Sequence, residues 1–168
     1  EFLDASPDLA SRTLAASYDV DRLLRRVDLL SASMDEALDS VALHEEFFLA
    51  RPSIRPVQSS EAWISSSFSR SRFHPVLLVN RPHPGVDISA AAGTPILATG
   101  KGVVLSAGNR SGYGKTVEID HGYGYRTLYA HAGALSVKKG QRVDRGDVLG
   151  EVGKTGLAKA PHLHYEVL

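Results

Sequence analysis

Two short motifs contain the residue types that bind a metal ion. His83 and Asp87 are separated by three residues, and His162 and His164 are separated by one. Side chains in a strand alternate between its two faces, so each spacing predicts a pair of side chains that share a face. Two imidazoles and one carboxylate, with a ligand position left for water, form the ligand set of a hydrolytic zinc site. The motifs together therefore indicate such a site; the alternative is that surface histidines merely lie near one carboxylate.

Glycine, charge and cysteine content restrict the elements that could carry this site. All 15 glycines lie between Gly85 and Gly156. The glycine-free N-terminal part therefore predicts helix and extended chain, and the glycine-rich C-terminal part predicts strands joined by tight turns. Residues 1–60 carry 11 acidic and 6 basic side chains, whereas residues 81–168 carry 7 and 11. The chain has no cysteine, so histidine and carboxylate are its only strong metal ligands. No apolar run reaches the roughly 18 residues of a membrane span, and nothing indicates a nucleic-acid partner.

Residues 16–49 predict one long helix, because they contain good helix formers and neither proline nor glycine. Two apolar series recur every seven residues, as in the core positions of a coiled coil. They consist of Val20, Val27, Met34, Val41 and Phe48, and of Ala16, Leu23, Leu30, Ala37 and His44. The helix would either pair with a second copy or dock on the rest of the chain. We expect a helical segment over residues 1–50, an extended linker over 51–64 and a folded domain over 65–168.

The glycine-rich part predicts a mainly β domain of antiparallel strands, similar to a barrel or sandwich. Short alternating segments recur, with turn signals between them and no helical period, so parallel βαβ units are not expected. They include residues 102–105, 115–120, 125–131, 148–152 and 163–167. A barrel-sandwich module of the lipoyl type is an alternative suggested by the turn at 140–150, but it would not explain the two histidine motifs.

From about residue 65 the chain resembles the lysostaphin-type, or LytM-domain, zinc metallopeptidases that cut peptidoglycan cross-bridges. Four motifs carry the resemblance in the order of that family, at residues 83–87, 123–131, 140–150 and 161–166. The resemblance implies that His83, Asp87 and His164 bind zinc and that His131 and His162 are the catalytic histidines. Glu166 shares a strand face with His164 and is expected to orient a metal-ligand imidazole.

The resemblance also implies what the protein acts on and where. We expect a zinc-dependent endopeptidase for peptidoglycan peptide cross-links, in which histidines activate the zinc-bound water. A D-alanyl cross-link is favoured over a glycine bridge, because a long helix without a wall-binding module is typical of envelope enzymes of double-membraned bacteria. This places the protein in the cell envelope or periplasm, with any membrane anchor outside this sequence. The alternative is a LytM-like regulatory domain that binds cell wall or activates an amidase without cutting.

Overall fold

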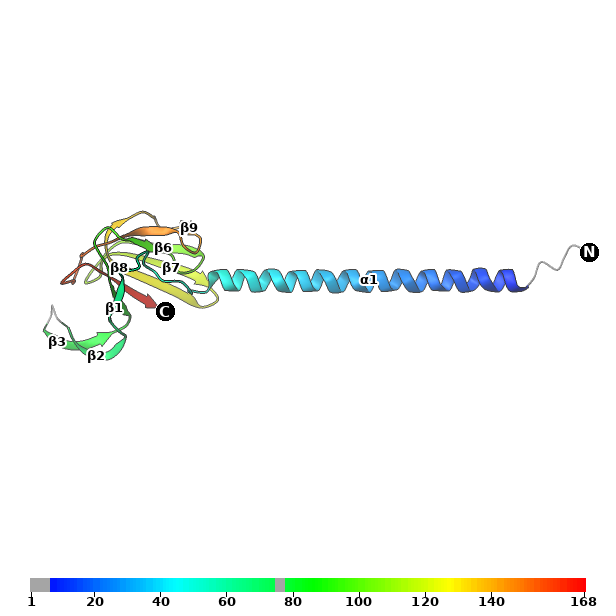
Figure 1. Cartoon of the computed structure of the whole chain (residues 1–168), viewed down its shortest axis with the longest axis horizontal. Helices are drawn as coiled ribbons and strands as arrows, with labels where there is room; N and C mark the ends of the chain where they lie inside the picture. Colours follow the sequence, from blue (N-terminus) through cyan, green and yellow to red (C-terminus); the bar gives the residue numbers. More distant parts are fainter. Residues whose placement is uncertain (1–6, 75–77) are drawn as a thin grey trace, which may run out of the picture. The chain divides into compact units, whose positions relative to one another are not determined.

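The computed structural model describes residues 7–74 and 78–168, and the described chain divides after Glu45 into a helical unit and a larger β unit. The first six residues of the predicted helical segment lie outside the described residues. Helix α1 spans Pro7–Ala50, so it begins nine residues before the predicted start at residue 16. Proline is tolerated in the first turn of a helix because its fixed φ suits that position and no partner is needed for its nitrogen. Figure 1 shows this helix and the strands of the β unit.

The last turn of α1 belongs to the β unit. Ala50 is buried there, the Lys101 amide donates to the Leu49 carbonyl at 2.8 Å, and the Lys101 ammonium pairs with Glu46 at 2.9 Å. The segment that follows also contacts the strands of the β unit. Val57 is buried and forms a β-bridge with Ile96. The first strand then begins inside the predicted linker range.

The β unit confirms the predicted antiparallel architecture. Nine strands form one sheet in the order β1-β4-β11-β8-β7-β6-β9, with β10 pairing with both β8 and β5, and strands β2 and β3 form a second sheet. The strands are β1 (Trp63–Ser66), β2 (Ser69–His74), β3 (Val79–His83), β4 (Val86–Ser89), β5 (Pro95–Leu97), β6 (Gly102–Arg110), β7 (Gly114–Gly122), β8 (Tyr125–Leu135), β9 (Arg142–Val143), β10 (Val148–Val152) and β11 (His162–Val167).

Strand β8 holds the sheet together because it pairs with three neighbours. It pairs with β7 along one edge, and along the other edge it pairs first with β11 and then with β10. Ala130 lies opposite His164 of β11, whereas Ala132 lies opposite Val152 of β10. His131 occupies the point of this exchange, and its φ of 62° lies in the left-handed region. Such a backbone costs free energy in a residue other than glycine, and strain of this kind occurs mostly at functional sites.

A buried tyrosine lies in the mainly apolar core of the β unit. The Tyr129 hydroxyl accepts from the Thr99 amide at 2.9 Å and lies 2.9 Å from the Thr99 hydroxyl, so its polar end is satisfied. Fully buried side chains around it anchor the strands that carry the candidate site; they include Ile96, Val104, Val117, Ile119, Leu149, Val152 and Leu163.

Candidate metal centre and catalytic cleft

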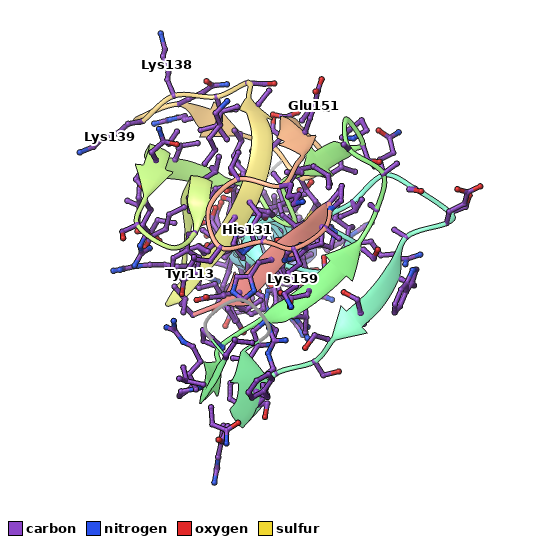
Figure 2. All side chains as sticks on the ribbon, turned by 90° about the vertical axis from the view of Figure 1, so that its left-hand side faces the viewer. Tyr113, His131, Lys138, Lys139, Glu151 and Lys159 are labelled. Atoms are coloured by element: carbon purple, nitrogen blue, oxygen red, sulfur yellow. The ribbon has the colours of Figure 1, made fainter. Side chains whose placement is uncertain are left out.

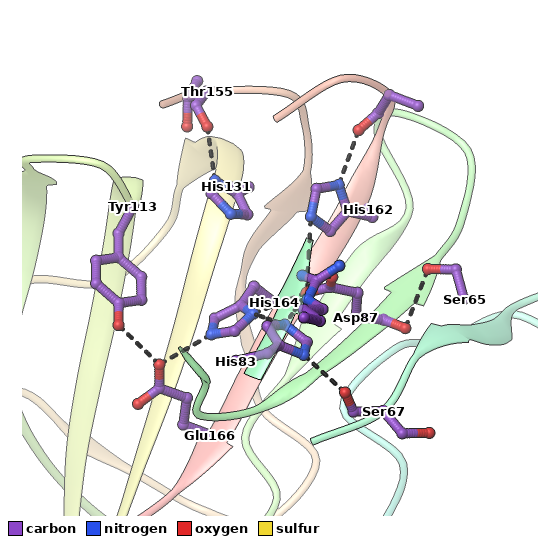
Figure 3. A network of polar contacts seen from close by, with 12 residues as sticks. Ser65, Ser67, His83, Asp87, Tyr113, His131, Thr155, His162, His164 and Glu166 are labelled. Atoms are coloured by element: carbon purple, nitrogen blue, oxygen red, sulfur yellow. Dashed lines mark hydrogen bonds and ion pairs between the residues drawn. The ribbon is translucent and has the colours of Figure 1, made fainter. Parts of the chain in front are cut away.

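The structure brings His83, Asp87 and His164 together at the junction of the two sheets. The Asp87 Oδ1 atom lies 3.0 Å from His83 Nε2 and 2.7 Å from His164 Nδ1, and the two nitrogens are 3.1 Å apart. All three residues are buried. Figure 3 shows the three side chains converging, with Glu166 and Tyr113 behind His164.

The prediction that His83 and Asp87 share one strand is wrong. His83 ends β3 in the small sheet, and Asp87 lies in β4 of the large sheet. The chain passes from one sheet to the other at Pro84 and Gly85, where a proline suits a break in strand pairing. A side chain at Gly85 would collide with the Tyr165 carbonyl, so a close backbone approach requires glycine there. The two side chains meet because the chain turns, and not because of the period of a strand.

The second motif has the predicted geometry. His162 and His164 both lie in β11, and both side chains face Asp87. His164 contacts Asp87 directly, whereas His162 Nε2 is 3.8 Å from Asp87 Oδ1. The register explains this arrangement, because His164 lies opposite Asp87 and His162 lies opposite Ser89 in the antiparallel pair of β11 and β4. Of the two histidines, His164 is therefore placed as the ligand and His162 beside it.

Hydrogen bonds outside the cluster decide which ring nitrogens can bind a cation. His83 Nδ1 donates to the Ser67 carbonyl at 2.8 Å, which leaves a lone pair on Nε2. His164 Nε2 donates to the Glu166 carboxylate at 2.9 Å, so Nδ1, which lies 2.7 Å from Asp87 Oδ1, is the ring nitrogen that a cation could bind in place of a proton. Two ring nitrogens and a carboxylate oxygen thus face one another, an arrangement that suits a cation. In tetrahedral zinc sites with bonds of about 2.0–2.1 Å the ligand atoms are about 3.3 Å apart, so a small outward movement would accommodate the ion.

The neighbours of Asp87 and Glu166 lower the pKa of both carboxyl groups. Burial alone would raise the pKa of Asp87, but the hydrogen bond from His164 and the nearby His83 hold that pKa well below its usual value. Burial likewise favours a higher pKa for Glu166, and its hydrogen bonds with His164 and Tyr113 outweigh burial and lower the pKa. Both carboxylates are therefore ionised at neutral pH. Glu166 has the predicted place behind His164, and its Oε1 also accepts from the Tyr113 hydroxyl at 2.9 Å.

His131 and His162 lie together beside the cluster, with their ring centroids 4.8 Å apart. His131 Nδ1 donates to the Thr155 carbonyl at 2.8 Å, and His162 Nδ1 donates to the Ala160 carbonyl at 2.8 Å. Because Nδ1 is occupied in both rings, Nε2 is the nitrogen that can accept and return a proton. Burial lowers the pKa of His131 to about 4, against the effect of its bond to Thr155, so the ring is neutral at pH 7.

The cleft that contains these groups has a volume of about 670 Å³. His83, Asp87, His131, His162 and His164 all line it, so the structure brings the five predicted residues into one cavity. Glu166 is not among the lining residues and lies behind them, which fits its expected role as an orienting group. His121 is elsewhere: it is buried at the β7 hairpin and bonds to the Lys101 carbonyl and the Thr127 hydroxyl.

Sequence reasoning missed three residues that contact the site. Arg72 donates to Asp87 Oδ2 at 2.9 Å, Tyr113 donates to Glu166, and the Thr155 carbonyl fixes the His131 ring. Tyr113 lies between two glycines at the start of β7, a pattern that could have identified a residue with an unusual position. Nothing in the local sequence around Arg72 or Thr155 indicates their contacts, because both arise from tertiary packing.

Comparisons with known proteins agree with the geometry. The model of Peptidase family M23 matches residues 81–168. The chain is 45% identical over 114 residues to the peptidoglycan DD-endopeptidase ShyA of Vibrio cholerae serotype O1, which covers 67% of the chain and 26% of ShyA. The chain therefore spans about a quarter of the length of that relative.

Two solved structures are also similar. A zinc-containing peptidase from Vibrio cholerae has a TM-score of 0.59 and 36% identity, covering 71% of this chain and 36% of that one. The catalytic domain of the prophage-encoded M23 protein EnpA from Enterococcus faecalis has a TM-score of 0.58 and 30% identity, covering 67% of this chain and 84% of that domain. The similarity to EnpA extends over most of a catalytic domain.

Proposed function

Because the chain belongs to peptidase family M23, we propose that its β unit is a zinc-dependent endopeptidase that hydrolyses peptide cross-links of bacterial peptidoglycan. Family membership confirms the resemblance to lysostaphin-type peptidases. One observation carries the proposal: three buried residues bring their possible ligand atoms together in a cleft, beside two histidines whose Nδ1 atoms are each bonded to a backbone carbonyl. A regulatory domain that does not cut would have no need of all five groups.

His83, Asp87 and His164 would hold the metal through the three atoms described above. Zinc bound in such a site acts as a Lewis acid and lowers the pKa of water from about 15.7 toward 7. Glu166 keeps His164 in the tautomer that has its lone pair on Nδ1, and Ser67 does the same for Nε2 of His83. Arg72 fixes the second oxygen of Asp87, so the carboxylate cannot rotate freely.

His131 and His162 would move the protons that peptide hydrolysis requires. One proton must leave the attacking water, and one must reach the amine that departs. Both rings have Nδ1 anchored on a backbone carbonyl, so each can accept or donate a proton only at Nε2. Neutral His131 can take part at pH 7 without first losing a proton, since burial lowers its pKa to about 4.

We propose the D-alanyl cross-link as the bond cut, in preference to a glycine bridge. The printed name of the Vibrio cholerae relative, a peptidoglycan DD-endopeptidase, supports this choice. The test is digestion of purified cross-linked muropeptide dimers and of pentaglycine peptides, with the products identified by mass. Cleavage of the dimers supports the proposal, and preferential cleavage of pentaglycine would reject it. A protein that binds peptidoglycan with its metal loaded but cuts neither substrate would be a regulatory domain.

We further propose that α1 pairs with a second copy of this chain and that the protein works in the periplasm. The two apolar series of α1 are exposed in the single chain, with Val20, Leu23, Leu30 and Met34 each more than half exposed. Exposing such an apolar stripe to water is unfavourable, and its seven-residue spacing matches the core positions of a coiled coil. Sedimentation of the full chain and of a Leu23→Glu, Leu30→Glu variant tests the pairing: a dimer that becomes a monomer supports it, and a monomeric parent chain rejects it.

The cellular location needs a separate experiment. Among the described residues, no helix is both long enough and apolar enough to cross a bilayer. Separately, we propose that a membrane anchor lies outside this sequence. Fractionation of the native protein between periplasm, membrane and cytoplasm tests both proposals, and recovery in the cytoplasm would reject them.

A further inference from the structure

The catalytic cleft is lined by three cationic side chains and only one carboxylate. The cations are Arg72, Arg81 and Lys159, and the carboxylate is Asp87. The charge of Asp87 is already shared, since Oδ1 contacts His83 and His164 and Oδ2 accepts from Arg72. A divalent metal ion would add further positive charge. A cleft with charge of one sign concentrates ligands of the opposite sign.

Two of the cations lie directly opposite each other on the small sheet. Arg72 of β2 and Arg81 of β3 are register partners in the antiparallel pair, and both side chains line the cleft. Like charges at opposite positions of two strands are destabilising. Arg72 has one anionic partner, Asp87, whereas Arg81 has no ion pair with any residue in the ranges 7–74 and 78–168. The pair therefore has unused donors and unbalanced charge.

Arg81 lines the same cleft as Tyr113 and the proposed metal ligands. Tyr113 contacts Glu166 behind the proposed metal ligand His164. Figure 2 shows Tyr113, His131 and Lys159 in the same region, whereas Lys138 and Lys139 extend from a distant turn. Lys159 of the cleft is thus separate from Lys138 and Lys139.

We propose that Arg72 and Arg81 form a subsite for a free carboxylate on a substrate residue that flanks the scissile bond. The inference rests on the proposed function. Guanidinium groups bind carboxylates through parallel hydrogen bonds. Arg72 contacts Asp87, which contacts both proposed metal-ligating histidines, so the subsite adjoins the metal site.

The subsite would determine which cross-links are cut. Where the carbon that bears the cross-linked amine also bears a free carboxylate, that carboxylate lies beside the scissile bond, whereas the middle of a glycine bridge has no charge nearby. The arginine pair would form an ion pair with the first kind of substrate and none with the second. It therefore gives a physical reason for preferring acidic peptide cross-links.

The test uses the zinc-loaded full chain and two synthetic cross-linked dimers that differ at one group. One dimer has a free carboxylate beside the scissile bond, and the other has a carboxamide there. We expect kcat/KM to favour the carboxylate by about 10- to 100-fold, the usual factor for a hydrogen bond to a charged group. The Arg81→Gln variant should reduce this preference to about threefold or less. Lys139→Gln, which changes an exposed lysine outside the cleft, should keep the full preference.

Each outcome has one interpretation. Equal cleavage of both dimers by the parent chain would overturn the subsite while leaving the endopeptidase activity intact. If Arg81→Gln lowers kcat/KM equally on both dimers, the subsite is also overturned, because Arg81 would then act on the fold or on the metal. If Lys139→Gln lowers the preference for the carboxylate dimer as much as Arg81→Gln does, the preference arises from general surface charge and the subsite is rejected. Cleavage of neither dimer by the parent chain would instead reject the proposed function.

Discussion

Glu166 allows the sharpest test of how the fold prepares the metal site. Its carboxylate accepts from His164 Nε2 at 2.9 Å and from the Tyr113 hydroxyl at 2.9 Å, and the side chains of His164 and Glu166 are each only 6% exposed. Changing Glu166 to Gln keeps the volume and one acceptor oxygen but removes the charge. Changing it to Leu removes both acceptors and leaves the His164 N–H and the Tyr113 hydroxyl without a partner.

Both changes should weaken zinc binding, and the loss should follow the number of contacts removed. Loss of a group that orients a metal-ligand histidine typically costs 10- to 100-fold in metal affinity, or about 1.4–2.7 kcal/mol. We expect Glu166→Gln near the lower limit, because one hydrogen bond to His164 can persist. Glu166→Leu should be near the upper limit. Tyr113→Phe removes only one of the hydrogen bonds that Glu166 accepts, so its effect should be smaller than that of Glu166→Gln.

The assay is competition for zinc with a chromogenic chelator at pH 7, with circular dichroism to verify folding. Glu151→Gln is the matched control, because Glu151 is exposed and is not a cleft-lining residue. If both Glu166 variants bind zinc as tightly as the parent chain, Glu166 does not orient His164 and the reasoning fails.

Three other predictions test separate parts of the account. His83→Ala should abolish stoichiometric zinc in elemental analysis, and retention of a full equivalent would remove His83 from the ligand set. His131→Ala and His162→Ala should keep zinc but lower turnover by about 10²–10⁴-fold, and near-parental turnover of either variant would refute its catalytic role. Burial lowers the pKa of His121, so the unfolded chain takes up a proton there first as the pH falls below about 6.5, and the free energy of unfolding decreases. His121→Gln should reduce this decrease in urea unfolding between about pH 7 and pH 5; an undiminished decrease in His121→Gln would contradict the assignment.

Much of the fold follows from local patterns in the sequence. The absence of glycine and proline predicts α1, and alternation between turn residues predicts β7, β8, β10 and β11 to within a few residues. The start of α1 was less predictable, because a proline can either precede a helix or stand in its first turn. The predicted boundary between linker and domain at residues 64 and 65 stays a prediction, although β1 begins at Trp63.

The candidate site was predictable in composition but not in geometry. The His-x-His pair lies on one strand as its spacing predicts, since both residues belong to β11. His83 and Asp87 do not, because Pro84 and Gly85 redirect the chain from the small sheet to the large one. The contacts of Arg72 with Asp87 and of Thr155 with His131 depend on packing between distant segments. No local period or motif specifies such contacts.

The most direct test of the central claim is cleavage of a D-alanyl cross-linked muropeptide dimer by chelator-treated protein, before and after one equivalent of zinc is added. The account predicts no cleavage by the stripped protein and full recovery with zinc, yielding two monomers that together have gained one water molecule. The His164→Ala variant should stay inactive after zinc is added. Cleavage that persists without metal, or a dimer that stays intact with zinc bound, would contradict the assignment of His83, Asp87 and His164 as the centre of a peptidoglycan endopeptidase.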